Sequence, residues 1–287
     1  MYLLPIAATA LAFTTTAYAH AQVYGLRVND QHQGDGRNKY IRSPSSNSPI
    51  LWDHVTHPSL ICNIRDDNQP PGPAPDFVRA FAGDRVAFQW YHARPNDPTD
   101  YVLDSSHLGV LVTWIAPYTD GSGTGPIWTK IHQDGWNGTH WATSRLISNG
   151  GFVEFRLPGS LKPGKYLVRQ EIIALHQADM PGPNRGPEFY PSCAHLEVFG
   201  SGEAAPPQGY DINKGYAESG DKLWFNIYIN KNDEFKMPGP EVWDGGVDLE
   251  SDGQLRNQAS QGEPTQMSSR KEWYYFCEKQ FIVTLYY

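Results

Sequence analysis

The chain has 287 residues, with 31 Asp and Glu against 23 Lys and Arg, so its formal net charge at pH 7 is -8. This acidic balance argues against a nucleic-acid-binding protein, which would need clustered positive charge to neutralise phosphates. Aromatic residues make up 13% of the chain and charged residues only 19%. Disordered chains are poor in aromatics and rich in charge, so most of this chain is expected to fold.

Residues 1–19 predict a secretory signal peptide. They form an apolar stretch that ends on Ala17-Tyr18-Ala19, the small-x-small pattern that precedes signal peptidase cleavage, although no positive side chain comes before it. No later stretch offers the roughly 18 consecutive apolar residues of a membrane-spanning helix. We therefore expect a secreted, extracellular monomer whose first mature residue is His20, with an uncleaved membrane anchor as the alternative.

Apolar residues alternate with polar ones in several short stretches, and this period of two predicts strands. The stretches are Arg85–Tyr91, Gly151–Pro158 and Lys222–Ile229. Continuous apolar runs at Leu108–Ile115 and Leu167–Leu175 predict strands that are buried on both faces. Turn signals separate these stretches, and no long stretch has a helical period. The sequence therefore predicts an all-β fold, an antiparallel two-sheet sandwich with long surface loops.

The patterned region predicts one domain over residues 20–243. From residue 244 the chain becomes polar and rich in Gly, Gln, Ser and Glu, which is typical of a linker. The aromatic stretch Trp273–Tyr287 is too short to form a core of its own. Residues 244–287 are thus expected to be a linker-like tail, and docking on the domain or a gene-model artefact both remain open for its end.

Three cysteines are present, and in an oxidising compartment two of them should pair. Cys62 and Cys193 lie inside the strand-patterned region and are the expected couple, which leaves Cys277 in the tail. Asn137-Gly138-Thr139 is an acceptor pattern for N-glycosylation, so we expect Asn137 to carry a glycan.

Cleavage after residue 19 would give His20 an unusual chemistry. An N-terminal histidine offers two nitrogens, the free α-amine and the ring Nδ1, which can chelate one metal ion. The amine has a pKa of about 7.7–8.0, so a metal can displace its proton near neutral pH. One further imidazole would complete three nitrogens in a T, and nitrogen-only tetragonal coordination favours copper over zinc, calcium or magnesium.

Four motifs follow this histidine in an order typical of one family. They are His20–Val23, Asp104–Gly109, Arg169–His176 and Phe189–Cys193. With weaker matches between them, they make residues 20–243 resemble fungal lytic polysaccharide monooxygenases, and more specifically auxiliary activity family nine, formerly glycoside hydrolase family sixty-one. Each motif alone is weak, but the ordered set is specific.

The resemblance implies a copper-dependent oxidative enzyme on an immunoglobulin-like or fibronectin-like sandwich, with one copper ion per chain. His20 would bind copper through its amine and Nδ1, and His107 through its other ring nitrogen. Tyr190 would fill the axial region and limit what else coordinates there. The family's disulfide matches Cys62 and Cys193.

The same resemblance implies catalytic roles for His176, Glu188 and Tyr190. His176 would position an oxygen species and assist proton transfer, because a protonatable imidazole can deliver the protons that oxygen reduction consumes. Residue 188 belongs to the same network. It lies two positions from Tyr190, so both side chains should point to the same face of a strand.

Two positions depart from the family pattern. Glu188 stands where the family usually has Gln, and a carboxylate adds negative charge and donates a hydrogen bond only when it is protonated. We expect Glu188 to favour Cu(II) over Cu(I) without abolishing binding. Val110 stands where Pro typically follows Gly109, and we expect a looser loop around His107.

The substrate surface should be flat, because a crystalline polysaccharide cannot enter a pocket. Exposed aromatic rings on one plane can stack on sugar faces. Tyr216, after Gly215, resembles the late tyrosine that family members present there, and we expect it to bind substrate. Tyr24 and Tyr210 are weaker candidates.

These features predict oxidative cleavage of β-1,4-glucan, foremost cellulose, at C1 and/or C4, with an external electron donor and O2 or H2O2. One alternative is a secreted copper- or glucan-binding protein of the same fold with weak or no turnover. A second is a glycosidase that uses Glu171 and Glu188, whose carboxyl groups would need to lie about 5–9.5 Å apart across a cleft. The choice between C1 and C4, the preference between cellulose and hemicellulose, and methylation of the His20 ring stay open.

Overall fold

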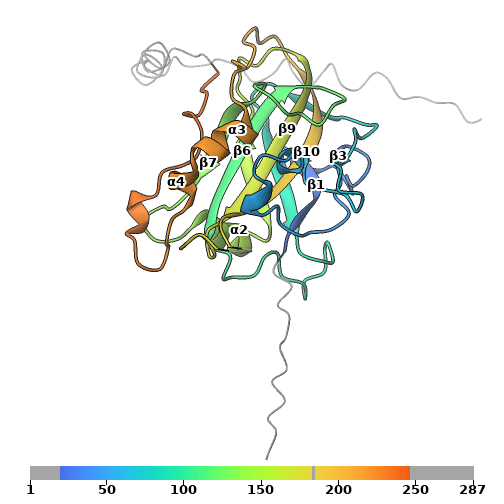
Figure 1. Ribbon diagram of the computed structural model, residues 1–287. Coiled ribbons are helices and arrows are strands. Elements are labelled where there is room, and N and C mark those ends of the chain that lie inside the picture. The colour runs from blue at the N-terminus through green and yellow to red at the C-terminus, as the bar shows by residue number, and fades with distance from the viewer. Residues whose placement is uncertain (1–19, 183–184, 246–287) are drawn as a thin grey trace, which may run out of the picture. The chain divides into compact units, whose positions relative to one another are not determined.

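The computed structural model describes residues 20–182 and 185–245 (Figure 1). These residues belong to one compact unit. The predicted signal peptide and almost all of the predicted tail, with Cys277, lie outside the described residues, so the domain limits at residues 20 and 243 stay predictions. Among the described residues, no helix is both long enough and apolar enough to cross a membrane.

Two sheets pack face to face. The smaller sheet has four antiparallel strands in the order β2-β1-β5-β8. The larger sheet has the order β3-β10-β9-β6-β7, and β4 pairs in parallel with β10. The strands are β1 (Gln22–Val28), β2 (Gln31–His32), β3 (Ile41–Arg42), β4 (Val78–Phe81), β5 (Arg85–Tyr91), β6 (Gly109–Pro117), β7 (Thr129–Asp134), β8 (Phe152–Arg156), β9 (Gly164–Ala174) and β10 (Glu188–Phe199).

The helices are short and lie outside the sheets. They are α1 (Ser59–Cys62), α2 (Ala142–Ser148), α3 (Ile212–Glu218) and α4 (Gly220–Leu223), with 3-10 turns η1 (Trp52–His54) and η2 (Asn232–Glu234). Asp211 caps α3, because its carboxylate accepts a hydrogen bond of 3.1 Å from the backbone N–H of Lys214. Figure 1 shows α3 and α4 beside β6 and β7.

Alternation along the central strands sorts their side chains into two apolar clusters. On β9, Val168 and Ile172 face the smaller sheet and join Phe88 of β5 in the core between the sheets. Leu167 and Ile173 point the other way and join the cluster that includes Ile212 of α3. Both faces of β6 and β9 are covered, so both strands are buried along most of their length, as the continuous runs in their sequences predicted.

The predicted β-sandwich is therefore confirmed, and so is the pairing of Cys62 with Cys193, which links the end of α1 to the middle of β10. The strand predicted at Lys222–Ile229 is wrong. Leu223 ends α4 and the chain then turns without pairing. Leu223 and Ile227 are both buried against the outer face of the larger sheet, so their alternation reflects packing of an irregular segment.

Candidate metal centre

The register of the larger sheet brings distant residues to one edge. Glu188 lies opposite Ala174 on β9, and Ala174 lies opposite Gly109 on β6. His176 comes two residues after Ala174, and His107 comes two residues before Gly109. Because neighbouring strands run antiparallel, β6 and β10 begin at the same end of the sheet at which β9 ends. Both histidines therefore lie at this end, next to the start of β10. The alignment of three strands thus gathers two imidazoles and a carboxylate.

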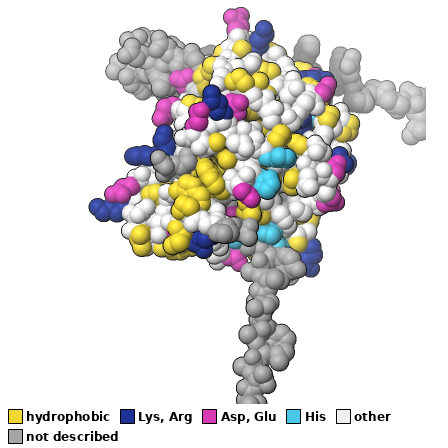
Figure 2. All heavy atoms as spheres, viewed as in Figure 1, with side chains coloured by type: hydrophobic (Ala, Val, Ile, Leu, Met, Phe, Trp, Pro, Cys, Tyr) yellow, Lys and Arg dark blue, Asp and Glu magenta, His cyan; other side chains and the backbone are white. Residues whose placement is uncertain are grey.

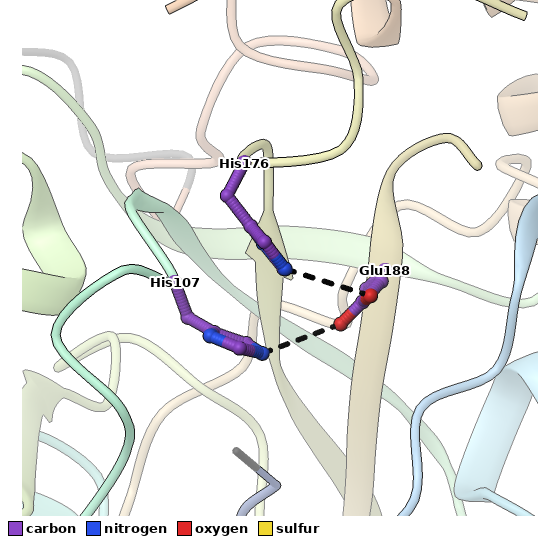
Figure 3. A group of neighbouring side chains, drawn as sticks. All are labelled: His107, His176 and Glu188. Carbon is purple, nitrogen blue, oxygen red and sulfur yellow. Dashed lines mark ion pairs between the residues drawn. The ribbon is translucent and has the colours of Figure 1, made fainter. Parts of the chain in front are cut away.

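These three side chains face one another (Figure 3). Nε2 of His107 lies 3.5 Å from Oε2 of Glu188, and Nε2 of His176 lies 3.6 Å from Oε1. The two imidazole rings are 3.9 Å apart between centroids. One donor atom from each residue lies within 4.8 Å of the others, and within the described residues no other three His, Cys, Asp or Glu side chains meet this condition. Figure 2 shows histidine side chains close together on the face in view.

Tyr190 and His20 complete the neighbourhood. The phenol of Tyr190 donates a hydrogen bond of 2.6 Å to Oε2 of Glu188. The rings of His20 and His107 lie 6.3 and 6.1 Å from the Tyr190 ring between centroids. The structure therefore brings all five predicted centre residues together. His20 is half-buried and stands outside the close group of three. Its predicted ligation through a free amine requires cleavage after residue 19, which lies outside the described residues, so it stays a prediction.

Burial and charge fix the protonation states in this cluster. Burial alone would raise the pKa of Glu188, but contacts with His107, Tyr190 and His176 outweigh it and lower that pKa below its usual value. Burial, followed by the charge of Glu188, raises the pKa of Tyr190 well above its usual value. Burial lowers the pKa of His176, although Glu188 opposes this shift. An ionised carboxylate thus faces a neutral phenol and an imidazole that is readily neutral.

The backbone that carries His107 is held from two sides. The N–H of Gly109 donates to Oγ1 of buried Thr143 at 2.9 Å, and the carbonyl of Leu108 accepts from the N–H of Leu175 at 2.8 Å. Glycine is required at 109, since a Cβ there would lie 2.0 Å from the carbonyl oxygen of Ile173. Val110 is fully buried in the strand ladder of β6. Val110 is therefore accommodated inside the sheet, and a looser loop around His107 stays a prediction.

The structure contradicts the expectation that Tyr216 meets substrate. Its side chain is 0% exposed, and its hydroxyl donates to Oε1 of Glu171, which also pairs with buried Arg169. A ring on the inner side of α3 cannot stack on a polysaccharide surface. Of the two weaker candidates, Tyr210 stacks on Trp114 and Tyr24 packs edge-on against Tyr91.

The glycosidase alternative is also wrong. The side chain of Glu171 is fully buried and paired with Arg169. It lies on the face of β9 that packs beneath α3, whereas Glu188 lies at the edge of the sheet. Glu171 therefore cannot flank a scissile bond together with Glu188.

Tyr228 is a residue that the sequence analysis missed. Its side chain is 64% exposed, and its hydroxyl donates a hydrogen bond of 3.1 Å to the backbone carbonyl of His176. Two further apolar residues are exposed nearby in the chain: Ile229 directly follows Tyr228, and Met180 lies four residues after His176. One signal was available, because the alternation of Leu223, Phe225 and Ile227 already put Tyr228 on the side opposite the buried residues.

Asn137 lies on the surface, and its Oδ1 accepts hydrogen bonds from the backbone N–H groups of Thr139 and His140 at 3.1 and 2.8 Å. Its glycosylation stays a prediction.

The fold and the cluster define a β-sandwich protein with a candidate metal centre at one end of its larger sheet. The model of Auxiliary Activity family 9 (formerly GH61) matches residues 20–235. The chain is 43% identical over 236 residues to an AA9 family lytic polysaccharide monooxygenase A from Collariella virescens, covering 79% of this chain and 82% of that protein. It is 38% identical over 249 residues to a protein of the same name from Armillaria gallica, covering 84% and 94%.

Solved structures agree. The structure of CvAA9A superposes with a TM-score of 0.73 at 42% identity, covering 80% of this chain and all of that one. A cellulose-active polysaccharide monooxygenase from M. thermophila gives 0.60 at 26% identity, covering 78% and 99%. These likenesses define the class as lytic polysaccharide monooxygenases, which are oxidoreductases. The chain belongs to Auxiliary Activity family 9, as its motifs predicted.

Proposed function

We propose that this protein is a secreted, copper-dependent lytic polysaccharide monooxygenase that oxidatively cleaves β-1,4-glucan, foremost cellulose, at C1 and/or C4. It would use an external electron donor and O2 or H2O2. The observation that carries the proposal is the convergence of His107, His176 and Glu188 at one sheet edge, with the rings of Tyr190 and His20 beside them.

The donor set fits copper. His107 directs its Nε2 toward Glu188, and its ring lies 6.1 Å from the ring of Tyr190 between centroids. His20 offers a second imidazole, 6.3 Å from the same Tyr190 ring. Both described cysteines are bonded to each other, so no thiolate of the described residues competes. Imidazole nitrogen with an open coordination position suits copper. His20 and His107 would hold the ion beside the ring of Tyr190, and the ion would supply one-electron chemistry with the oxidant.

The protein's own groups would control protons around that ion. The raised pKa of Tyr190 keeps its phenol neutral, so it holds Glu188 through a hydrogen bond and presents no phenolate charge. Burial lowers the pKa of His176, so its ring is readily neutral and can accept a proton at Nε2, which faces Glu188. Glu188 faces both histidines and orients their Nε2 atoms inward.

Tyr228 would provide the sugar-binding ring that Tyr216 cannot provide. Its side chain is exposed, and its hydroxyl donates a hydrogen bond to the backbone carbonyl of His176. A glucan stacked on the Tyr228 ring would therefore pass beside the centre. Cellulose is proposed as the substrate because the M. thermophila structural relative is described as cellulose-active.

Product analysis tests this proposal. Secreted protein incubated with cellulose, ascorbate and copper should release aldonic or 4-keto oligosaccharides, and EDTA should abolish them. His107→Ala should remove the products, whereas His140→Ala, at an exposed histidine remote from the cluster in sequence, should not. Copper binding without oxidised products would favour the non-catalytic alternative, and neutral sugars that form despite EDTA would overturn copper-dependent oxidation.

A further inference from the structure

The candidate metal centre draws its residues from both sheets. His20 lies two residues before β1 of the smaller sheet. The other residues lie at one end of β6, β9 and β10 in the larger sheet: His107, His176, Glu188 and Tyr190. The separation of His20 from His107 therefore depends on how one sheet sits on the other. Apolar packing fills most of the space between the sheets, and its attraction is not directional.

A row of polar side chains crosses the core face of the larger sheet. Gln170 of β9 lies opposite Thr113 on β6 and opposite Ser192 on β10. All three residues are buried. They lie on the core face, since the residues two positions away from each along its strand belong to the core between the sheets. Nε2 of Gln170 donates a hydrogen bond of 3.1 Å to Oγ1 of Thr113.

Trp90 of β5 joins this row from the smaller sheet. Its indole N–H donates a hydrogen bond of 2.9 Å to Oε1 of Gln170, and both residues are buried. Trp90 lies opposite Val23 of β1, three residues after His20. A chain of hydrogen bonds thus runs from the strand beside β1 across the core to β9 and β6. Because its groups are buried, breaking the chain would leave polar atoms unpaired at a cost that exposed groups do not incur.

We infer that Trp90 and Gln170 are positioning residues, whose hydrogen bond holds the sheet that carries His20 in a fixed place against the sheet that carries His107. This inference rests on the proposed function, since it concerns the geometry of the same centre. Along β10, Tyr190 lies between Glu188 and Ser192 of the polar row, and all three share a face of the strand. Loss of the bond should let the sheets shift and change the separation of the two imidazoles.

Gln170→Leu tests this inference, because leucine has a similar size but no acceptor for the indole N–H. In a chain that begins at His20, Gln170→Leu should bind Cu(II) about threefold to tenfold more weakly, with an altered EPR spectrum of the bound Cu(II). Trp90→Phe removes the donor instead and should change both in the same direction. In both variants, the NMR shifts of the His20 and His107 rings should also move in the metal-free protein.

Two variants serve as controls. Tyr216→Phe loses a buried hydrogen bond to Glu171 on the opposite face of β9, which does not touch the contact between the sheets. Ser192→Ala removes a hydroxyl of the polar row that makes no hydrogen bond with the described residues. Both variants should keep the copper affinity, EPR spectrum and ring shifts of the unsubstituted protein.

The comparison with Tyr216→Phe decides the outcome. If Gln170→Leu and Trp90→Phe match Tyr216→Phe in copper affinity and in the ring shifts, the positioning role is overturned. Failure of the proposed function would instead appear as weak or absent copper binding by the unsubstituted protein. The ring shifts of the metal-free variants would then still decide whether the hydrogen bond positions the two histidines.

Discussion

The phenol of Tyr190 donates a 2.6 Å hydrogen bond to Oε2 of Glu188, two positions away on β10. Residues two apart on a strand share a face, so the pairing follows from the strand itself. The bond turns the carboxylate toward His107 and His176, which lie 3.5 and 3.6 Å from its two oxygens. An ionised carboxylate is thus fixed beside the candidate copper site.

Glu188→Gln should raise the Cu(II)/Cu(I) potential of the copper-loaded protein. The carboxylate stabilises the more positive ion, and a unit charge a few Å away at an effective dielectric constant of about 20 is worth a few kcal/mol, on the order of 100 mV. Voltammetry of the two proteins measures the shift. Glu154→Gln, at an exposed carboxylate on β8, is the control. A potential unchanged or lowered in Glu188→Gln would contradict the electrostatic role.

Tyr228→Ala should weaken cellulose binding about threefold to tenfold, because the variant loses an exposed stacking ring. Tyr228→Phe should keep most of the affinity while losing the hydrogen bond to the carbonyl of His176. Binding isotherms on cellulose, with thermal unfolding as a check on folding, separate the two effects. Identical isotherms for Tyr228→Ala and the unsubstituted protein would remove Tyr228 from the substrate surface.

Tyr216→Phe should lower the free energy of unfolding by about 1–2 kcal/mol without changing cellulose binding. The substitution removes the buried hydroxyl that donates to Glu171 and leaves the Arg169–Glu171 pair in place. Urea unfolding measures the loss. Weakened cellulose binding at unchanged stability would instead restore the surface role that the sequence suggested.

Stability should fall in acid partly through His195, which is buried and accepts a 3.0 Å hydrogen bond from Nε of Arg42. Burial, then the charge of Arg42, lowers the pKa of His195 from 6.5 to about 4. Between these values the unfolded chain binds a proton that the folded chain does not. The free energy of unfolding therefore drops as pH falls from 6.5 to 4, by up to about 3 kcal/mol from this group.

The variant His195→Gln keeps an acceptor for Arg42 but does not titrate. Urea unfolding between pH 7 and 4 should therefore give a shallower decline for His195→Gln than for the unsubstituted protein. Parallel declines would show that His195 is not the titrating group.

Strand patterns predicted most of the sandwich. β6 is buried on both faces and is apolar along its length, whereas β8 is buried on one face and its apolar residues alternate with exposed charged ones. The segment at Lys222–Ile229 has the alternating apolar pattern of a strand because Leu223 and Ile227 are buried, but no strand pairs with it. Pairing is a tertiary property that eight residues do not encode.

The centre could be predicted from ordered motifs, since His107, His176 and Tyr190 each lie inside one and Glu188 directly precedes the last. Their convergence depends on the register that aligns Glu188, Ala174 and Gly109 across three strands, which no single segment specifies. Tyr216 was misassigned because exposure depends on packing. Its helix, α3, turns that ring toward Glu171, and the exposed ring beside His176 belongs to Tyr228.

Copper titration of two N-terminal forms tests the central claim most directly. A chain that begins at His20 should bind one Cu(II), and a chain with Ala19 still attached should bind it about 100-fold or more weakly, because the extra residue converts the amine ligand into an amide. His107→Ala in the first form should cause a comparable loss. Equal copper affinity for the two N-terminal forms would contradict the assignment of His20 and His107 as the ligands of one copper ion.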